Sequence, residues 1–251
     1  MVEIKNLSFS YGKTGVVKDI SFSFNTGKIY GIIGPNGCGK STLLKLISGI
    51  LKPDTGKILI DNQDIKNINR NDLSLKLGFM PQTRPIPDMT VADYVLCGRF
   101  PHRKIKGNSQ KKDTEILNLS LTITDTTEFI DRRMTQLSGG ERQRVYLAQL
   151  LAQETETGLC DEPTTYLDIK SNISVMDILT SMKNENKCVV TVLHDLVSAL
   201  KYCDEIILMD RGQIIDTGTP ESLIKNGNIK KIFGVDCKEI TTDKGKNYIL
   251  E

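Results

Sequence analysis

The sequence predicts an α/β fold in which a mostly parallel sheet carries helices on both faces. An N-terminal antiparallel β layer and a helical insertion complete the predicted architecture. Three observations lead to this prediction. Short apolar runs suited to buried strands alternate with helical patterns over most of the chain. One such run ends in a glycine-rich turn at residues 34–39, and the strand signal weakens between residues 84 and 137.

The chain length of 251 residues fits one large α/β domain. We expect a core made of residues 1–83 and 138–251, which includes the β layer, and a helical subdomain at residues 84–137. The composition, with 39% hydrophobic and 25% charged residues, is that of an ordinary globular protein. It excludes disordered and fibrous classes.

Charge, cysteines and hydropathy narrow the class of protein further. The longest stretch without a charged side chain, residues 29–39, is far shorter than the ~20 apolar residues of a membrane helix. Residues 1–4 lack the apolar segment of a secretory signal, so we expect a cytoplasmic protein. The six cysteines form no C-x-x-C pair, which argues against a zinc site and against disulfides. A net charge of +2 gives no reason to expect a nucleic-acid partner.

The N-terminal part is expected to contain the β layer and the first buried strand. Alternating apolar and polar residues at 2–4 and 20–24 predict strands with one exposed face. The nearly continuous apolar run at residues 28–33 predicts a buried parallel strand. A helix is predicted from Lys40 to about Leu51, because its apolar residues share one face and a proline follows its end.

The same rules predict the later elements. Thr90 is expected to cap a helix in the insertion, and a charged stretch at residues 103–112 separates that helix from apolar residues 116–121. Further on we expect helices at 139–153 and 169–182, strands ending at Cys160 and spanning 188–193, and a hairpin at 237–251 around Asp243, Lys244 and Gly245.

Residues 34–41 read Gly-Pro-Asn-Gly-Cys-Gly-Lys-Ser and match the Walker A pattern G-x-x-x-x-G-K-[ST]. The motif lies between an apolar strand and a helix, as phosphate binding requires. Backbone N–H groups of the turn and the positive end of the helix surround phosphate oxygens. Lys40 is expected to reach the β and γ phosphates, and Ser41 to offer its hydroxyl to Mg²⁺. The expected fold is that of a RecA-like P-loop NTPase. Its expected nucleotide contacts in this segment are Gly34, Asn36, Gly37, Gly39, Lys40, Ser41 and Thr42.

A second motif separates the classes that a P-loop leaves open, which include kinases, GTPases and motor ATPases. Residues 137–144 read Leu-Ser-Gly-Gly-Glu-Arg-Gln-Arg, and with this motif residues 3–217 resemble the ATP-binding cassette (ABC) family. Ser138, Gly139 and Gly140 lie at a predicted helix start, where a hydroxyl and backbone N–H groups face an anion. The resemblance implies that they contact ATP bound by another copy, so that ATP holds two copies together as a homodimer.

Asp161 and Glu162 follow the predicted strand end. The resemblance implies that Asp161 supports Mg²⁺ through water and that Glu162 orients and deprotonates the attacking water. The family usually has four bulky aliphatic residues before this pair, whereas this chain has Thr-Gly-Leu-Cys at residues 157–160. Because glycine weakens a buried strand, we expect a less firmly held strand at this position.

Four further residues resemble family positions. His194 follows the strand at 188–193 and so lies where α/β sheets bind ligands; it resembles the histidine that contacts the γ-phosphate. Gln82 resembles the glutamine that joins the Mg²⁺ site to the helical insertion. Asp168 resembles the aspartate of the loop that touches the partner cassette, and Tyr11 resembles the aromatic residue that stacks on adenine. The expected catalytic residues are thus Lys40, Gln82, Glu162 and His194, and the expected Mg²⁺ residues are Ser41, Gln82 and Asp161.

The resemblance also implies a task. A single cassette is expected to hydrolyse ATP and to drive separate integral membrane permease subunits, which it contacts through residues 84–137 at the cytoplasmic face of the membrane. Residues 98–102, Gly-Arg-Phe-Pro-His, are similar to a run in the ATPases of ferric siderophore, haem and cobalamin importers. In such importers a substrate-binding protein is an indirect partner.

Two other classes remain open from the sequence. One is a non-transport cassette ATPase, such as an iron–sulfur cluster assembly ATPase, which uses the same nucleotide chemistry. The other is a nucleotide-binding regulator that does not hydrolyse ATP, which the unusual strand before Asp161 favours. A comparison of ATP hydrolysis by the wild type and by Glu162→Gln separates this regulator class from the ATPases, because only an ATPase has a turnover that the substitution removes.

Overall fold

The larger of two main sheets has the strand order β10-β9-β3-β8-β7-β6 in our computed structural model, which describes residues 1–104, 110–242 and 245–251. Neighbouring strands are parallel except β10, which pairs antiparallel with β9. The prediction of a mostly parallel sheet is confirmed. The strands are β3 (Lys28–Ile33), β6 (Leu77–Met80), β7 (Thr157–Asp161), β8 (Cys188–Val192), β9 (Glu205–Asp210) and β10 (Gln213–Gly218).

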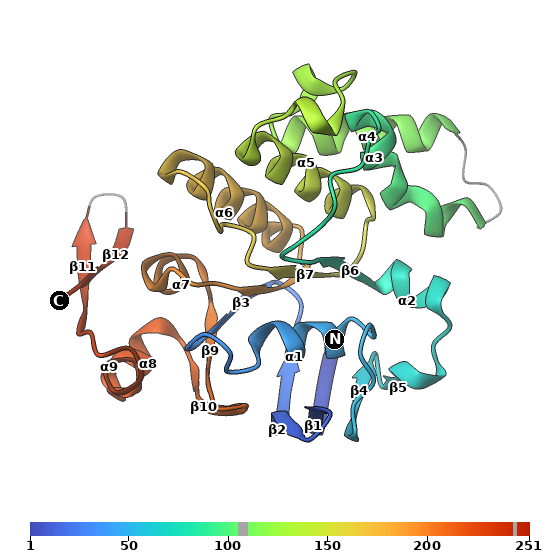
Figure 1. Cartoon of the computed structure of the whole chain (residues 1–251). Coiled ribbons are helices and arrows are strands. Elements are labelled where there is room, and N and C mark those ends of the chain that lie inside the picture. Colours follow the sequence, from blue (N-terminus) through green and yellow to red (C-terminus); the bar gives the residue numbers. More distant parts are fainter. Residues whose placement is uncertain (105–109, 243–244) are drawn as a thin grey trace.

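Helices cover both faces of this sheet, as predicted (Figure 1). Alternate residues of β3 enter two different cores. Ile29 and Ile33 pack with residues of α5 (Gly139–Ala152), α6 (Ile169–Asn184) and α7 (Leu196–Tyr202), whereas Tyr30 and Ile32 pack with residues of α1 (Lys40–Ile47).

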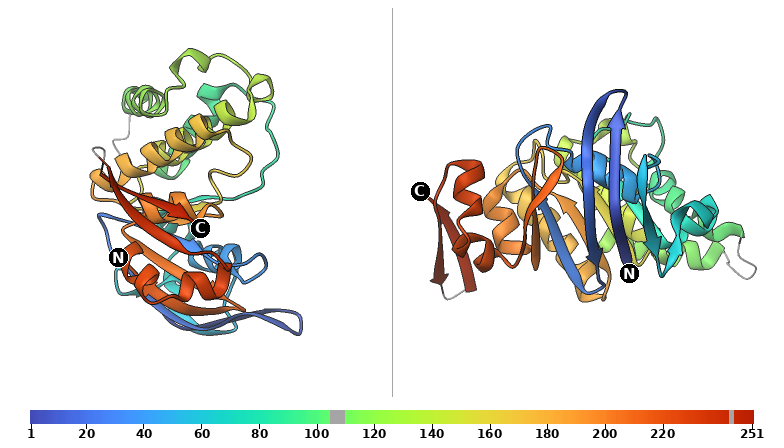
Figure 2. Two further views of the ribbon diagram at one scale, coloured as in Figure 1. Left: turned by 90° about the vertical axis from the view of Figure 1, so that its left-hand side faces the viewer. Right: turned by 90° about the horizontal axis from the view of Figure 1, so that it is seen from below.

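The second sheet is the predicted antiparallel layer, in the order β2-β1-β4-β5. It lies on the far side of α1 from the parallel sheet (Figures 1 and 2). Its strands are β1 (Val2–Tyr11), β2 (Thr14–Phe24), β4 (Thr55–Ile60) and β5 (Gln63–Asp64). Helix α1 ends at Ile47, earlier than the predicted end near Leu51, because Gly49 takes a left-handed conformation with φ of 74°.

Between β6 and β7 the described chain is mainly helical. The elements are α3 (Val91–Leu96), η2 (Cys97–Lys104), α4 (Gln110–Ile123), η3 (Thr127–Phe129), η4 (Met134–Gln136) and α5; η1 (Ile65–Asn67) and α2 (Arg70–Lys76) precede β6. Thr90 caps α3 as predicted, since its hydroxyl accepts a hydrogen bond from Asp93 N at 3.1 Å. Part of the charged stretch predicted at 103–112 falls on residues 105–109, outside the described ranges. The division at residues 84 and 137 stays a prediction.

The strand with the unusual sequence, β7, lies between β6 and β8, and all five of its residues are buried. Gly158 lies opposite Gly78 of β6. A Cβ on Gly78 would lie 2.4 Å from Leu150 Cδ1, and a Cβ on Gly158 would lie 2.7 Å from Met182 Cε. The paired glycines therefore let α5 and α6 pack close to the sheet. Packing from two helices and pairing on both sides thus take the place of the missing side-chain bulk. The expected weaker hold on this strand stays a prediction.

The C-terminal part adds α8 (Pro220–Lys225), α9 (Asn228–Phe233) and the predicted hairpin of β11 (Cys237–Thr242) and β12 (Gly245–Leu250). Of its predicted turn, Asp243 and Lys244 lie outside the described residues, and Gly245 begins β12. Tyr248 of β12 is buried against the helical core. The helices within the described ranges are all too short or too polar to span a bilayer.

Candidate active site

A cavity of about 800 Å³ lies where β3, β7 and β8 end. This is the edge of a parallel sheet at which α/β folds bind ligands. The cavity is lined by Val16, Asn36, Gly37, Gly39, Lys40, Ser41, Thr42, Gln82, Glu162, Thr164, Thr165, Tyr166, Asn172, His194 and Asp195. The structure thus brings predicted site residues together in one cavity, although Asn36 and His194 are 158 positions apart in the sequence.

The turn after β3 has a backbone conformation that requires glycine at two positions. Gly34 and Gly39 have φ of 153° and 108°. A Cβ at Gly34 would lie 2.1 Å from Met209 O, and a Cβ at Gly39 would lie 2.5 Å from Val16 O. The turn is therefore pressed against β9 and β2, and α1 begins directly behind Gly39, with its free N–H groups directed at the cavity.

Lys40 is the buried cation of this turn. Its side chain lies among backbone atoms, and Nζ donates hydrogen bonds to Gly34 O at 2.8 Å and Pro35 O at 3.0 Å. Both partners are uncharged carbonyl groups, so the ammonium charge has no carboxylate partner among these bonds. A phosphate oxygen in the cavity would offer Lys40 a stronger, charge-assisted bond.

Ser41 and Asp161 form the part of the site suited to Mg²⁺. Ser41 Oγ donates to Asp161 Oδ1 at 2.8 Å. Burial raises the pKa of Asp161, and the hydrogen bond from Ser41 opposes this shift. A hydroxyl and a carboxylate are hard oxygen ligands of the kind that Mg²⁺ binds. In the described ranges no group of three or more His, Cys, Asp and Glu side chains is arranged to hold a metal ion. The residues fit a Mg²⁺ that phosphate and water also coordinate.

Glu162 is held in an unusual backbone conformation at the end of β7. Its φ of 54° lies in the left-handed region, which costs energy for a residue with a side chain. Its carboxylate is nearly buried and accepts hydrogen bonds from the amide of Gln82 and from Thr165 Oγ1, the latter at 3.0 Å. His194 Nε2 contacts the other oxygen, Oε1. Three side chains from three segments therefore fix one carboxylate at the cavity wall.

Other predicted nucleotide contacts lie outside this cavity lining. Tyr11 is half-exposed at the end of β1, with its ring edge-on to Phe9 at a centroid distance of 4.9 Å. Ser138 caps α5 in a capping box with Glu141, which lowers the pKa of Glu141, and Ser138 and Gly139 are exposed. Gly34 (behind the turn), Gly140 (beside Ser171 on α6) and Asp168 (the exposed cap of α6) complete this group, and their predicted contacts stay predictions.

Sequence reasoning missed several lining residues. Val16 comes from β2 and Asn172 from α6, and neither has a local signal. The buried Oδ1 of Asn172 has no hydrogen-bond partner among the described residues. Thr165 stands in the loop between Glu162 and Asp168, so its closeness in sequence to the acid pair was a usable signal.

Comparisons with known proteins agree with this geometry. The family described as ABC transporter matches residues 17–165. The chain belongs to the ABC transporter ATP-binding family. It is 39% identical to the petrobactin import ATP-binding protein FpuD of Bacillus anthracis, over 96% of this chain and 89% of that protein. It is 35% identical to the ferric enterobactin transport ATP-binding protein FepC of Escherichia coli (strain K12), over 93% and 87% of the two chains.

Solved ABC structures share the fold. One, from an inward-facing conformation of a metal-chelate type ABC transporter, is 27% identical with a TM-score of 0.83 and covers 100% of this chain and 96% of its own. Another, a dimeric post-hydrolysis ABC cassette bound to ADP and Pi, is 29% identical with a TM-score of 0.77, over 88% and 99% of the two chains. ABC ATPases hydrolyse ATP, and those of importers dimerise and act with membrane permeases. The chain is therefore an ABC ATPase that binds ATP.

Proposed function

We propose that this ABC ATPase is the energy-supplying subunit of an importer for a ferric siderophore or a related chelate such as haem or cobalamin. The observation that carries the proposal is the similarity, over nearly the whole chain, to ATP-binding proteins named for petrobactin and ferric enterobactin. The Gly-Arg-Phe-Pro-His run at residues 98–102 supports it. These relatives favour transport over an iron–sulfur cluster assembly ATPase.

The side chains of the cavity have distinct tasks in this proposal. Lys40 exchanges its two backbone carbonyl partners for the β and γ phosphate oxygens of ATP and neutralises charge there. Glu162, held by Gln82, Thr165 and His194, accepts a proton from the attacking water. Mg²⁺, held by Ser41 and Gln82 and reached by Asp161 through water, would supply positive charge to the phosphates when bound. His194, on the exposed rim, donates to the γ-phosphate.

The site is completed by a second copy of the chain. Ser138, Gly139 and Gly140 start α5 away from the lining of their own cavity, and the hydroxyl and N–H groups of an exposed helix start can bind an anion. We infer that they bind the γ-phosphate held by the facing copy, with Asp168 at the same interface and Tyr11 against adenine. Loss of the γ-phosphate removes these contacts and releases the dimer.

Residues 84–137 form the proposed contact with the permease subunits. In this region Arg84 joins the end of β6 to the helices: its guanidinium lies 4.1 Å from the ring centroid of Tyr146 on α5 and donates to Tyr94 Oη on α3 at 3.2 Å. Arg84 Nε also donates to Pro81 O at 3.2 Å, next to Gln82 in the chain. In this proposal the chain lies peripherally on the cytoplasmic face, and a substrate-binding protein acts with it indirectly.

The test compares wild type with Glu162→Gln. We expect the wild type to hydrolyse ATP and the variant to bind ATP without turnover and to elute as a dimer in gel filtration with ATP. Persistent monomer would contradict the shared site.

For the transport step, the tagged chain is purified from native membranes. Co-purifying multi-span subunits support transport, whereas soluble scaffold proteins would support the assembly alternative. Loss of radioactive ferric siderophore uptake on deletion, restored by the wild type but not by Glu162→Gln, tests the substrate class.

A further inference from the structure

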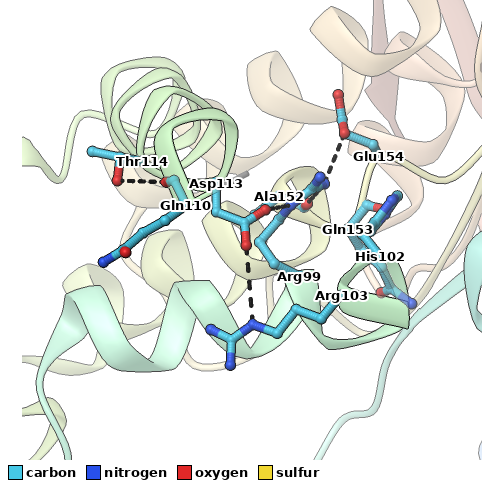
Figure 3. A network of polar contacts seen from close by, with 9 residues as sticks. All are labelled: Arg99, His102, Arg103, Gln110, Asp113, Thr114, Ala152, Gln153 and Glu154. Carbon is cyan, nitrogen blue, oxygen red and sulfur yellow. Dashed lines mark hydrogen bonds and ion pairs between the residues drawn. The ribbon is translucent and has the colours of Figure 1, made fainter. Parts of the chain in front are cut away.

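The C-terminal end of α5 is held by side chains of the η2 segment (Figure 3). Arg99 Nη1 donates to Ala152 O at 2.7 Å, and His102 Nε2 lies 2.8 Å from Gln153 O. These carbonyls belong to the last residue of α5 and to its cap, where the helix has no partner of its own for them. Two side chains from η2 therefore close the end of this helix.

Arg99 is fully buried and joins several segments at once. Besides Ala152 O, its guanidinium binds Asp113 Oδ1 of α4 at 2.9 Å and Glu154 Oε2 at 2.7 Å, as Figure 3 shows. The planar fork of an arginine meets such partners in fixed directions, unlike the single ammonium of a lysine. Its positive charge also interacts favourably with the negative end of the helix dipole at the C-terminus of α5.

The backbone at η2 is equally close to α5. A Cβ at Gly98 would lie 2.5 Å from Gln149 O, so only a glycine permits this approach. On the other side, Gln153 Nε2 donates to Ser74 O of α2 at 2.8 Å. The end of α5 is therefore fastened both to η2 and to α2, the helix directly before β6.

The opposite end of α5 carries the signature motif, with Ser138 as its cap. A helix of 14 residues is about 21 Å long and stiff on that scale. Fixing one end therefore limits the direction in which the other end is presented. We propose that Arg99 and His102 are positioning residues, which orient α5 so that Ser138 meets ATP bound by the facing copy. The inference rests on the ATP-bound homodimer of the proposed function.

The experiment uses Glu162→Gln as the parent, so that ATP is not consumed. Arg99→Lys is added to it, because lysine keeps the charge and loses the fork. The matched control is Arg103→Ala: Arg103 is 53% exposed and reaches toward Asp113 at 4.0 Å rather than toward the α5 carbonyls. Dimer formation is followed by analytical ultracentrifugation over a range of ATP concentrations, and ADP affinity by calorimetry.

We expect Arg99→Lys to raise the ATP concentration for half-maximal dimerisation about tenfold, as the loss of a charge-assisted hydrogen bond implies. ADP affinity should stay within about twofold of the parent, because the P-loop of the same chain binds ADP. Arg103→Ala should match the parent both in the ATP concentration for half-maximal dimerisation and in ADP affinity. If Arg99→Lys does not fold, judged by circular dichroism, His102→Leu removes one contact only and should show the same split more weakly.

Two results would overturn the inference. One is an Arg99→Lys variant, or a His102→Leu variant in its place, that dimerises at the ATP concentration of the parent. The other is an equal loss of ADP affinity, which a general structural defect would cause. A Glu162→Gln parent that stays monomeric with ATP would instead overturn the proposed dimer, and the inference with it.

Discussion

Glu162 combines backbone strain with an unusually complete set of side-chain partners. Its left-handed φ is a conformation that persists only when the surroundings stabilise it. Thr165, Gln82 and His194 provide those surroundings. The carboxylate is thereby held in one orientation, and a base held in this way, the proposed role of Glu162, needs little rearrangement during reaction.

Thr165 offers a test of that orientation. Thr165→Val keeps the shape of the side chain and removes the 3.0 Å hydrogen bond to Glu162. We expect kcat to fall about fivefold, since one hydrogen bond is worth ~1 kcal/mol, while ATP affinity stays unchanged. Thr165→Ser keeps the hydroxyl and serves as the control. Steady-state hydrolysis and nucleotide titration measure the two quantities; a loss of affinity with kcat unchanged would show that Thr165 acts on binding instead.

Gly78 of β6 and Gly158 of β7 allow α5 and α6 to pack close to the sheet. Gly78→Ala places a methyl group 2.4 Å from Leu150 Cδ1, in a packed core. We expect the free energy of unfolding to fall by about 1–3 kcal/mol, the usual cost of overpacking. Gly158→Ala should cost less, because it meets the flexible end of Met182. Gly15→Ala, in an exposed part of β2, is the matched control. Urea denaturation gives the three values; an unchanged Gly78→Ala would mean that α5 shifts freely.

The C-terminal hairpin gives a pH-dependent prediction. Lys246 of β12 donates to Glu221 of α8 at 2.5 Å, and this bond lowers the pKa of Glu221 from 4.5 to about 2. A lowered folded-state pKa stabilises the fold above pH 4.5, and this contribution is lost as the pH falls from 4.5 toward 2.

We therefore expect Lys246→Met to lower the melting temperature slightly at pH 7, with the difference from wild type shrinking below pH 4.5. The effect should be small because both side chains are largely exposed. Lys225→Met, an exposed lysine on α8, is the control. Thermal unfolding followed by circular dichroism at several pH values gives the difference in melting temperature between the variant and the wild type. A difference that does not change with pH would exclude this ion pair as its cause.

In the proposed homodimer, each active site is built from two copies of the chain. The P-loop face and the signature face of one copy belong to different sites of the proposed dimer. Lys40→Ala therefore damages the site on one side of a chain, and Ser138→Arg damages the site on the other side. Each variant alone should be inactive.

Mixing the two variants should restore activity. In an equal mixture half of the dimers contain both variants, and each of these has one intact site of two, so we expect about a quarter of the wild-type rate. Hydrolysis is measured at equal total protein. Mixtures that stay inactive, with both variants folded and able to dimerise with wild type, would contradict a site shared between chains.

Most of the fold and the family followed from residue order alone. The motif at residues 34–41, the alternation of strands and helices, and the cap at Thr90 depend on neighbours in the chain, so local patterns reveal them. The end of α1 was placed too late, because the apolar face continues to Leu51 while the backbone of Gly49 ends the helix.

The order of residues was enough to identify the family and to propose which residues contact phosphate, because both depend on particular residue types at short, fixed spacings. Three features became visible only in the folded chain: the close packing that accommodates Gly158 near the acid pair, the place of Thr165 and Asn172 in the cavity wall, and the contacts of buried Arg99 with the end of α5. Each of these depends on contacts between segments far apart in the chain or on the exact path of a loop. No local pattern encodes such contacts, since they depend on how distant elements pack together in three dimensions.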